Sequence, residues 1–279
     1  MKTNIISIFT RTPLHIGAGS SVGAIDQPII RERHTGFPTI PGSAVKGVMA
    51  DLFLNEKREL SKEGLSILGS AKGDVGQSGT VSFGEGKLLA FPVRSAKGCF
   101  AWVTSPMTVC RWLRDAGIAC KLPEVKDDAV YAAEALMLSD GKVLLEGYLL
   151  NAAKIPAGLV EALLKACDDP MWQELLPEHL LLASDELLSH FCTASCEIAQ
   201  HVCIDDETGT AKDGALFNQE NVPAETLFYA PLSELRTVNN GQSPLDVLQA
   251  KLPPVLQFGA DATTGLGFCT VSMSTSTLA

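Results

Sequence analysis

The sequence predicts an α+β fold, from two observations about how its helix and strand patterns follow one another. Short apolar runs typical of strands are interspersed with stretches whose apolar residues recur every three to four positions, as on one face of a helix. Short turn-forming segments join several of the strand-like runs, which favours antiparallel hairpins. We therefore expect antiparallel strands and helices to mix along the chain.

The first predicted elements are a strand over Thr3–Thr10, rich in Ile and Phe, and the glycine-rich segment "LHIGAGSSVGAIDQPIIRE" that follows. This segment contains a loosened dinucleotide fingerprint and the G-x-S-x-G pattern of serine hydrolases, and both motifs need a helix directly after the glycines. Residues 24–41 contain three prolines and the β-branched pair Ile29-Ile30, without helical spacing of apolar residues. A loop between extended segments is therefore favoured over both enzyme motifs.

The next predicted element is a helix in "IPGSAVKGVMADLF", because its apolar residues fall at helical spacing. Ser43 is the expected N-cap residue. Lys46 then lies in the first turn, where the helix macrodipole disfavours a cation by about 0.3–1 kcal/mol. A lysine beside free N–H groups is half of an anion site, and a solvated lysine at the edge of the apolar face explains the pattern equally well.

The middle of the chain is expected to mix a hairpin with further helices and strands. The apolar runs at 88–93 and 99–104, joined by "RSAKG", predict the hairpin. A short helix follows, capped by Ser105-Pro106 and ended by Gly117. Further helices are predicted at Asp128–Leu138, Pro156–Ala166 and Asp185–Cys192, and strands at Val143–Leu150 and Glu197–Ile204.

The last third of the chain predicts a projecting hairpin and a glycine-rich loop. The polar stretch "DDETGTAKDG" lies between a strand and the apolar "ETLFYAPL", which indicates a hairpin with a long tip. Gly259, Gly265 and Gly267 precede the final strand and allow a backbone to approach another group closely, although an ordinary turn explains them too. We found no repeat or clear linker, so one elaborated domain over 1–279 is favoured.

Composition restricts the class of protein. The chain is 46% hydrophobic, enough for a core, and we expect neither a membrane span nor a signal peptide from its apolar runs. Its eight cysteines lack a framework spacing, which suits a reducing compartment and predicts a cytoplasmic protein. The spacing within one candidate cluster is not that of a zinc knuckle, and no role is assigned to it: His190, Cys192, Cys196, His201 and Cys203.

The net charge of −10 argues mildly against a polyanionic partner such as a nucleic acid. Net charge is a poor guide to a local site, however. Arg31, Arg33 and Lys46 lie among glycines and prolines near the N-terminus, away from the acidic stretches. A basic groove on an acidic body is therefore compatible with the sequence.

Several stretches, taken together and in this order, resemble the RAMP superfamily of CRISPR-associated proteins. They are "LHIGAGSSVGAIDQPIIRERHTGFPTIPGSAVKGVMADLF", "LLAFPVRSAKGCFAWVTSP", "DDETGTAKDGALF", "PAETLFY" and "TTGLGF". The chain is similar to the repeated backbone subunit of type III-B (Cmr) effector complexes, from Ile6 to near the C-terminus, with little similarity between 111 and 192. The resemblance implies an RRM-like, ferredoxin-type fold, with a largely helical insertion at about 111–192 and a thumb hairpin at about 198–225.

The same resemblance implies a function. Copies of the subunit would stack along a CRISPR guide RNA together with other Cmr-type subunits, without a membrane, and would cut the paired single-stranded target RNA at regular intervals. The expected cofactor is a divalent metal, Mg²⁺ or Mn²⁺. The thumb hairpin would unstack a base of the duplex at each subunit and so position the scissile nucleotide.

The resemblance also implies roles for individual residues. Asp26 corresponds to the catalytic acid and is the expected metal ligand, with His15 close by and Glu85 and Glu225 as further catalytic candidates. Glu85 stands where the family pattern usually has Asp, which leaves its role open. An aspartate ionised at neutral pH is suited to holding Mg²⁺ or to accepting a proton from a ribose 2′-OH. The expected RNA-binding residues are Gly17, Gly19, Arg31, Gly42, Ser43, Lys46, Gly265 and Gly267.

Two alternatives remain, and only the second belongs to another class of protein. A purely structural RAMP subunit would bind the guide without cutting, and the acid at position 26 argues against it. A nucleotide-dependent small-molecule enzyme would need a helix after Gly23, which the prolines disfavour.

Overall fold

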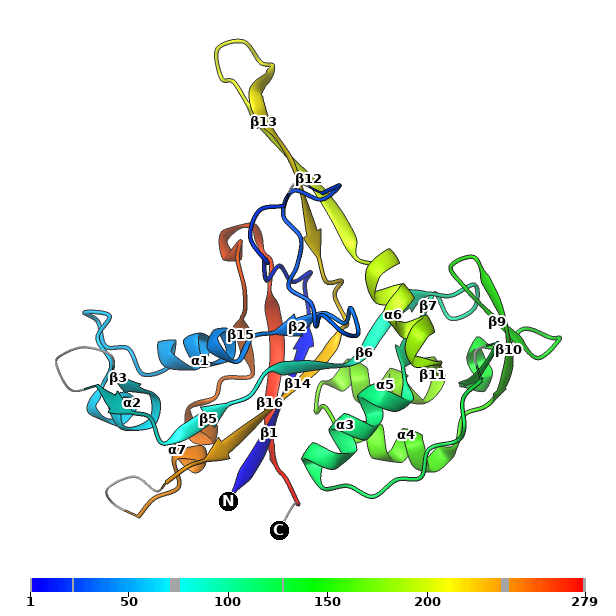
Figure 1. The fold of residues 1–279 in the computed structure, drawn as a ribbon, viewed down its shortest axis with the longest axis horizontal. Helices are drawn as coiled ribbons and strands as arrows, with labels where there is room; N and C mark the ends of the chain where they lie inside the picture. Colours follow the sequence, from blue (N-terminus) through cyan, green and yellow to red (C-terminus); the bar gives the residue numbers. More distant parts are fainter. Residues whose placement is uncertain (1, 22, 71–75, 127, 237–240, 278–279) are drawn as a thin grey trace.

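Four antiparallel strands form the centre of the structure, a computed structural model that describes all residues except 1, 22, 71–75, 127, 237–240 and 278–279 (Figure 1). Within the sheet the four strands are neighbours in the order β16, β1, β14, β6, and each adjacent pair is antiparallel. Their bounds are β1 Thr3–Thr10, β6 Gly86–Arg94, β14 Leu227–Glu234 and β16 Phe268–Thr275.

Helices join these strands in the pattern of a ferredoxin-like fold. Helix α1 (Gly42–Asp51) follows the first of the four strands, and α7 (Pro244–Lys251) lies between the third and the fourth. In chain order the sheet therefore reads 4-1-3-2, the arrangement of a split βαβ fold. Val45 and Met49 of α1 and Leu248 of α7 share one apolar core with Ile6 and Ile8 of β1. The predicted α+β, ferredoxin-like class is confirmed.

The opposite face of the sheet is also covered by helices. Because side chains alternate along a strand, Ile5 and Phe9 of β1 point away from α1 and join a second core. Trp112 and Trp172 enter this core from the covering helices, and the ring of Phe9 lies 6.1 Å from that of Trp172. These helices are α3 (Pro106–Ala116), α4 (Ala157–Leu164) and α5 (Pro170–His179). The centre of the sheet is thus buried on both faces.

Beyond β6 the sheet continues with further strands, most of which lie in the segment 111–192, where the family resemblance is weakest. In spatial order these strands are β7 (Phe100–Thr104), β11 (Leu180–Leu182), β8 (Ala129–Ala132), β10 (Tyr148–Lys154) and β9 (Lys142–Leu145). A bridge between Ser95 and Leu145 brings β9 back to the end of β6. Residues 111–192 therefore hold β8–β11 as well as α4, α5 and most of α3 and α6 (Asp185–Ala194).

Two predicted elements in this region were wrong. Residues 128–138 form the strand β8 and a 3₁₀ turn at Glu134–Leu136 instead of a helix, because β8 pairs with β10 and β11. The predicted strand at 143–150 is a hairpin of two strands, with Glu146 at a φ of 48° in the turn. Pairing with strands distant in the sequence decided the first outcome, whereas a tight turn at Glu146 and Gly147 decided the second.

Local signals were reliable where a helix end carries its own cap. Ser105 caps α3 through a reciprocal pair of hydrogen bonds with Thr108, and Gly117 ends the helix in the left-handed region, as predicted. Strand β1, the β6–β7 hairpin, α4 and α6 also match their predictions, with end shifts of up to a few residues. Residues 23–41 contain no helix, which contradicts the nucleotide-dependent enzyme considered above.

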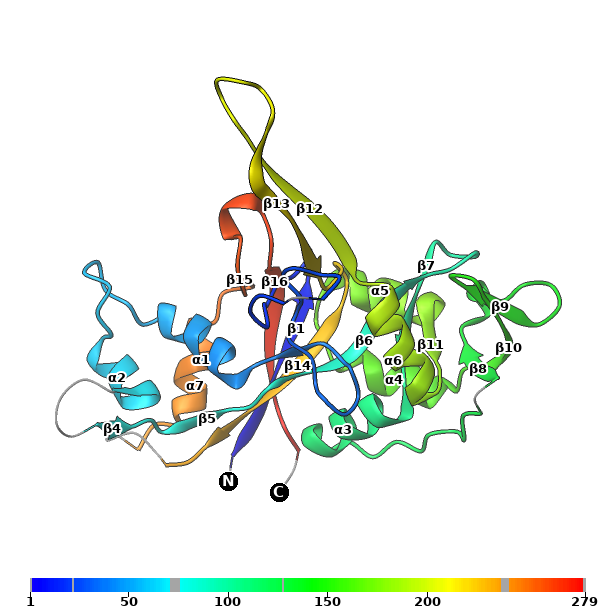
Figure 2. The ribbon, with the colours of Figure 1, turned by 45° about the horizontal axis from the view of Figure 1, so that its top comes forward.

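A long hairpin projects from the body, as predicted (Figures 1 and 2). It consists of β12 (Glu197–Ile204) and β13 (Ala211–Asn221), which form a separate two-stranded sheet. None of the helices in the described part of the chain is long and apolar enough to cross a membrane. The remaining elements are β2 Thr39–Ile40, α2 Lys62–Leu68, β3 Gly69–Ser70, β4 Gln77–Ser78, β5 Val81–Phe83, β15 Val255–Gln257 and a 3₁₀ turn at Ala262–Thr264.

Candidate functional site

The outer edge of β13, at the base of the hairpin, holds the segments that carry Asp26 and His15, two of the four predicted catalytic residues. Asn218 and Glu220 direct their backbone groups away from β12, as in the non-hydrogen-bonded pairs of an antiparallel ladder. Gln27 donates its N–H to the Asn218 carbonyl (3.1 Å) and accepts from the Glu220 N–H (2.9 Å). Leu14 and Val222 exchange two backbone hydrogen bonds of 2.8 and 2.9 Å. The glycine-rich loop thus lies along the free edge of the hairpin (Figure 2).

Asp26 is bound to Asn218 in both directions. The Asp26 N–H donates to Oδ1 of Asn218 (2.7 Å), and the Asn218 N–H donates to Oδ2 of Asp26 (2.8 Å). The Asn218 amide also donates to the carbonyl of Ala24 (3.1 Å). Within the described residues, Oδ1 of the half-buried Asp26 has no hydrogen-bond partner. One carboxylate oxygen is therefore held by the protein, while the other is available to a ligand.

His15 is hydrogen-bonded to the same edge of β13, and only 5% of the residue is exposed. Its Nδ1 lies 2.7 Å from the Glu220 carbonyl, which can only accept, so Nδ1 donates in this bond and Nε2 is the nitrogen left for other contacts. A Cβ on Gly17 would lie 2.9 Å from this Nε2, so the loop passes His15 closely at a residue without a side chain. The anchors of His15 and Asp26 are two residues apart on β13, about 7 Å along the strand.

Glu220 and Arg31 form a buried ion pair under the loop. Glu220 is 4% exposed, and its carboxylate accepts from Arg31 Nη2 at 2.5 Å and from the Ile29 N–H at 3.0 Å. Arg31 also donates to the carbonyls of Gly36 and Cys192, each at 2.9 Å, and to the thiol sulfur of Cys196 at 3.3 Å. Through these bonds the Arg31 guanidinium joins the loop, the end of α6 and the hairpin, and its contact with RNA remains a prediction.

The glycine-rich loop at 259–267 also contacts the site, through His15 and through Gln219 of β13. Ala260 donates its N–H to the His15 carbonyl (3.0 Å), and the Asp261 carboxylate accepts from Gln219 Nε2 (2.9 Å). Gly267 has a φ of 77°, and a Cβ there would lie 1.9 Å from the Phe258 carbonyl, so a larger residue does not fit. The backbone at Gly265, in contrast, has open space beside it.

Asn218, Gln219 and Glu220 each hold one of the segments around the site, and the sequence analysis missed all three. Asn218 holds the segment at 24–27, Gln219 the loop at 259–267, and Glu220 the segment at 29–31. Gln219 and Glu220 are almost fully buried, which is unusual for such side chains unless they are paired. The signal available in the sequence was an uninterrupted polar run, "NQEN", between two strand-like stretches.

Two of the predicted catalytic residues lie apart from this edge. Glu85 is exposed and lies beside Gly86, which pairs with Ile40. Measured along the strand direction, it is about 16 Å from the end of β1 at Thr10, where the hairpin begins. Glu225 occupies the turn before β14 at a φ of 62°, and its carbonyl accepts from the indole N–H of Trp102 (2.7 Å). Burial, with a smaller contribution from the charge of Glu197, raises the pKa of Glu225. Glu225 thus belongs to the junction of hairpin and sheet.

The start of α1 differs from its prediction. Pro41 is the N-cap residue and Ser43 lies inside the helix without a capping bond, because Pro41 already accepts from Ala44 and Val45. Lys46 is consequently in the second turn, exposed, and forms no ion pair or hydrogen bond with another described residue. The argument from the helix macrodipole no longer applies to Lys46, and its contact with RNA remains a prediction. Gly42 packs closely against the Phe83 carbonyl, while Gly19 is exposed.

The described residues do not build a metal site by themselves. No group of three or more His, Cys, Asp or Glu side chains with suitable geometry occurs in the described part of the chain. Mg²⁺ prefers six oxygen ligands, and at this edge the chain offers the Asp26 carboxylate. In the cysteine cluster, His190 instead contacts the Tyr148 hydroxyl (2.8 Å), and burial raises the pKa of Cys196 to about 11.

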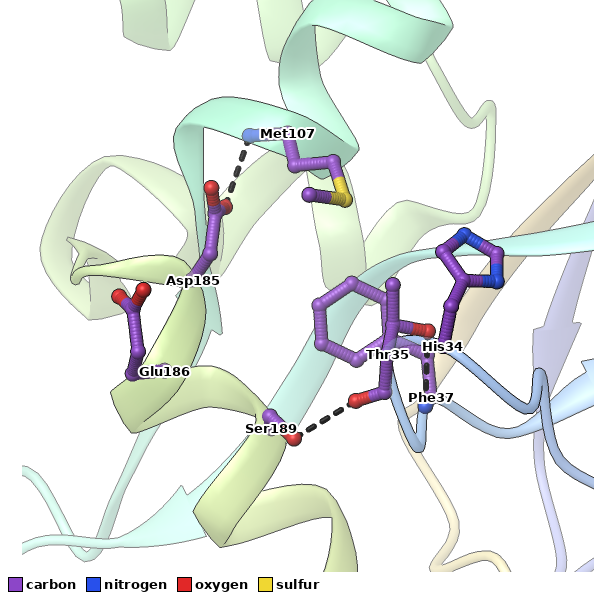
Figure 3. A pocket seen from close by; sticks show the side chains of 7 residues that line it. All are labelled: His34, Thr35, Phe37, Met107, Asp185, Glu186 and Ser189. Atoms are coloured by element: carbon purple, nitrogen blue, oxygen red, sulfur yellow. Dashed lines mark hydrogen bonds between the residues drawn. The ribbon is translucent and has the colours of Figure 1, made fainter.

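A separate pocket of about 310 Å³ lies between residues 34–37 and the first turns of α3 and α6 (Figure 3). The hydroxyl of Ser189 donates to the Thr35 carbonyl (2.6 Å), and the Met107 N–H donates to Asp185 (2.9 Å). None of the residues predicted for the functional site lines this pocket. Its hydrogen bonds fix the segment that follows Arg31, and we assign it no ligand.

The class of the protein follows from two features. One is a ferredoxin-like sheet with a projecting hairpin, and the other is a glycine-rich loop that holds Asp26 at the base of this hairpin. The chain belongs to the RAMP superfamily, whose family model matches residues 8–270. It is 34% identical over 285 residues to the CRISPR system Cmr endoribonuclease Cmr4 of Pyrococcus furiosus, across 98% of this chain and 96% of that protein. The CRISPR system Cms endoribonuclease Csm3 of Enterococcus italicus is 50% identical over 44 residues, 15% of this chain and 21% of the relative.

Solved structures give the same assignment. The crystal structure of oligomeric Cmr4 from Pyrococcus furiosus superposes with a TM-score of 0.78 at 30% identity, over 99% of both chains. A chain of the type III-B Cmr-beta complex bound to cognate target RNA superposes with a TM-score of 0.75 at 18% identity, over 97% of this chain and 96% of that chain. At that lower identity the similarity shows the fold alone.

Proposed function

We propose that this chain is a guide-RNA-binding backbone subunit of a type III-B CRISPR effector complex and the endoribonuclease that cuts the paired target RNA. The observation that carries the proposal is the position of Asp26 at the base of the projecting hairpin, in a chain 34% identical to a Cmr endoribonuclease over nearly its full length. Copies of the chain would stack along the guide beside other Cmr-type subunits. The oligomeric crystal structure of the Pyrococcus relative supports this self-association.

The hairpin is suited to disturbing a stacked duplex. Ile198, Val202 and Leu216 lie on one of its faces and are about half exposed or more, although they are aliphatic. Exposed apolar groups on a projecting element indicate a contact with a partner. Inserted beside a base pair, they would favour an unstacked nucleotide, which brings its ribose and phosphate within reach of the hairpin's base.

The carboxylate of Asp26 would act on that nucleotide as a general base. Its unpaired Oδ1 accepts the proton of the ribose 2′-OH, the 2′ oxygen attacks the adjacent phosphorus, and the bond to the 5′ oxygen breaks. The leaving 5′ oxygen takes a proton from water, and the products are a 2′,3′-cyclic phosphate and a 5′-hydroxyl. Alignment of the attacking and leaving oxygens supplies much of the rate, because a duplex held in regular stacking disfavours this geometry.

The cofactor and the location are proposals of the same kind. A divalent cation, Mg²⁺ or Mn²⁺, would find Asp26 as its ligand in this chain and would otherwise be held by phosphate oxygens and water. We propose a cytoplasmic protein, which its eight free cysteines support. For binding of the guide backbone we propose Lys46 with Gly42 and Ser43 at the start of α1, and Gly265 in the loop beside the RNA.

The proposal is tested by purifying the native complex that contains this chain. We expect small RNAs with a common repeat-derived end to copurify, and a labelled complementary RNA to be cut at regularly spaced positions. Chelation of divalent cations, followed by titration of Mg²⁺ or Mn²⁺, tests the cofactor. Absence of bound RNA in the purified complex would contradict the proposal. So would a wild-type complex that binds the complementary RNA in the presence of divalent cations but does not cut it.

A further inference from the structure

We propose that Asn218 is a positioning residue for target cleavage, which holds Asp26 with one carboxylate oxygen toward the RNA. Through this residue the cutting group and the base of the hairpin move as one unit. The inference rests on the proposed function and deepens it, because it names the device that orients the catalytic carboxylate.

All four hydrogen-bonding groups of Asn218 are directed at one short segment of the loop. Its backbone N–H binds the Asp26 carboxylate, and its carbonyl accepts from the Gln27 N–H. Its side-chain oxygen accepts from the Asp26 N–H, and its side-chain amide donates to Ala24. The Asp26 backbone and side chain are therefore both fixed to a single residue that lies 192 positions away in the sequence.

The asparagine side chain is matched to this task. The loop presents a donor at Asp26 and an acceptor at Ala24, and an amide supplies one group of each kind from one planar unit. Aspartate in its place offers acceptors alone, and alanine offers neither. The segment before Asp26 is rich in glycine and exposed at residues 18–21, so few other contacts restrain the carboxylate.

The two oxygens of Asp26 acquire different roles in this arrangement. Oδ2 is occupied by the Asn218 N–H, and Oδ1 remains for the reacting ribose. Displacement of a catalytic group by about 1 Å costs on the order of 100-fold in rate. Loss of the Asn218 side chain is therefore expected to reduce cutting without removing any group that touches RNA.

The experiment uses the effector complex assembled with guide RNA and this chain as wild type, Asn218→Ala or Asn218→Asp. Asn151→Ala, an exposed asparagine on β10 in the part of the chain far from the hairpin, is the matched control. Two quantities are measured: the single-turnover cleavage rate and the affinity for target RNA. Melting temperatures establish that the variants are folded.

We expect Asn218→Ala to lower the cleavage rate by about 10- to 100-fold, with target affinity within about twofold of wild type. Asn218→Asp retains an acceptor for the Asp26 N–H but places a second carboxylate beside Asp26. Because the hydrogen bond to the Asp26 N–H survives, Asn218→Asp should recover part of the cleavage rate that Asn218→Ala loses, at the same target affinity.

Three results would overturn the inference: wild-type cutting by Asn218→Ala, equal losses of affinity and rate, or Asn218→Asp cutting no faster than Asn218→Ala. If Asn218→Ala does not fold, Asn218→Asp decides, because the inference requires a lower cleavage rate at unchanged target affinity. Asp26→Asn in the same assay distinguishes a failure of the catalytic role of Asp26 from a failure of the positioning role of Asn218. Its cutting at the wild-type rate would refute the role of Asp26, whereas an inactive Asp26→Asn with a fully active Asn218→Ala would refute the positioning role alone.

Discussion

Replacing Glu220 tests how much the buried ion pair with Arg31 stabilises the base of the hairpin. Glu220→Ala would leave the guanidinium and the Ile29 N–H without their carboxylate, in surroundings where the side chains of Glu220 and Arg31 are 5% and 19% exposed. Breaking a buried ion pair on one side costs about 3–5 kcal/mol. Glu220→Gln keeps the shape and two hydrogen-bonding groups but loses the charge, for which we expect about 1.5–3 kcal/mol.

The assay is equilibrium unfolding in urea, with the free energy of unfolding compared between wild type and variants at constant m-value. Glu207→Gln, an exposed glutamate at the hairpin tip, is the matched control and should change stability by less than about 0.5 kcal/mol. The double replacement Arg31→Met with Glu220→Leu should cost less than the sum of the two single replacements, because no unpaired charge remains. Glu220→Gln at wild-type stability would refute the reasoning.

Three further predictions concern RNA binding, the hairpin tip and pH. Lys46→Ala should weaken guide binding without sequence preference and reduce the slope of log K against log salt by about 0.7, and an unchanged slope would make Lys46 a solvated lysine. Replacement of residues 206–214 by a short Gly-Ser turn should leave the fold intact and impair cutting, since a projecting polar tip contributes little to the core, and loss of folded protein would refute this. Burial and the nearby Glu197 raise the pKa of Glu225 in the folded state, so its stabilising effect is complete below the unfolded pKa and is lost as pH rises through the folded pKa. Glu225→Gln should therefore raise the melting temperature at pH 7 relative to wild type, by an amount that shrinks toward pH 4, and an equal difference at both pH values would contradict it.

The fold could be predicted from the sequence wherever an element carries its own boundary signals. Helix α3 has a capping serine at its start and a left-handed glycine at its end, so both ends are fixed locally. Strand β8 shows the opposite case: its apolar residues fit a helix as well as a strand, and pairing with β10 and β11 decides. The N-cap of α1 was misplaced by two residues, because Pro41 takes the role assigned to Ser43.

The candidate site was predictable only in part, for a related reason. Asp26 and His15 were identified through family resemblance and lie on one strand edge. Asn218 and Glu220, which hold them there, are about 190 residues distant and match no motif. The pairing of Arg31 with the buried Glu220 carboxylate was also not predicted, and the contact of Arg31 with RNA remains a prediction. Pairing of this kind depends on the tertiary fold, which a one-dimensional pattern does not encode.

The role of Asp26 is tested most directly by separating cutting from binding in Asp26→Asn. Asparagine has nearly the same shape and can still accept from the Asn218 N–H, but it lacks the charge and basicity of a carboxylate. In complexes with guide RNA and divalent metal, we expect cleavage of the complementary RNA to be abolished, with target affinity unchanged or slightly higher because an anion near RNA has been removed. Cleavage at the wild-type rate would assign the chemistry to another group, and a parallel loss of affinity and cleavage would show that Asp26 maintains the shape of the loop instead.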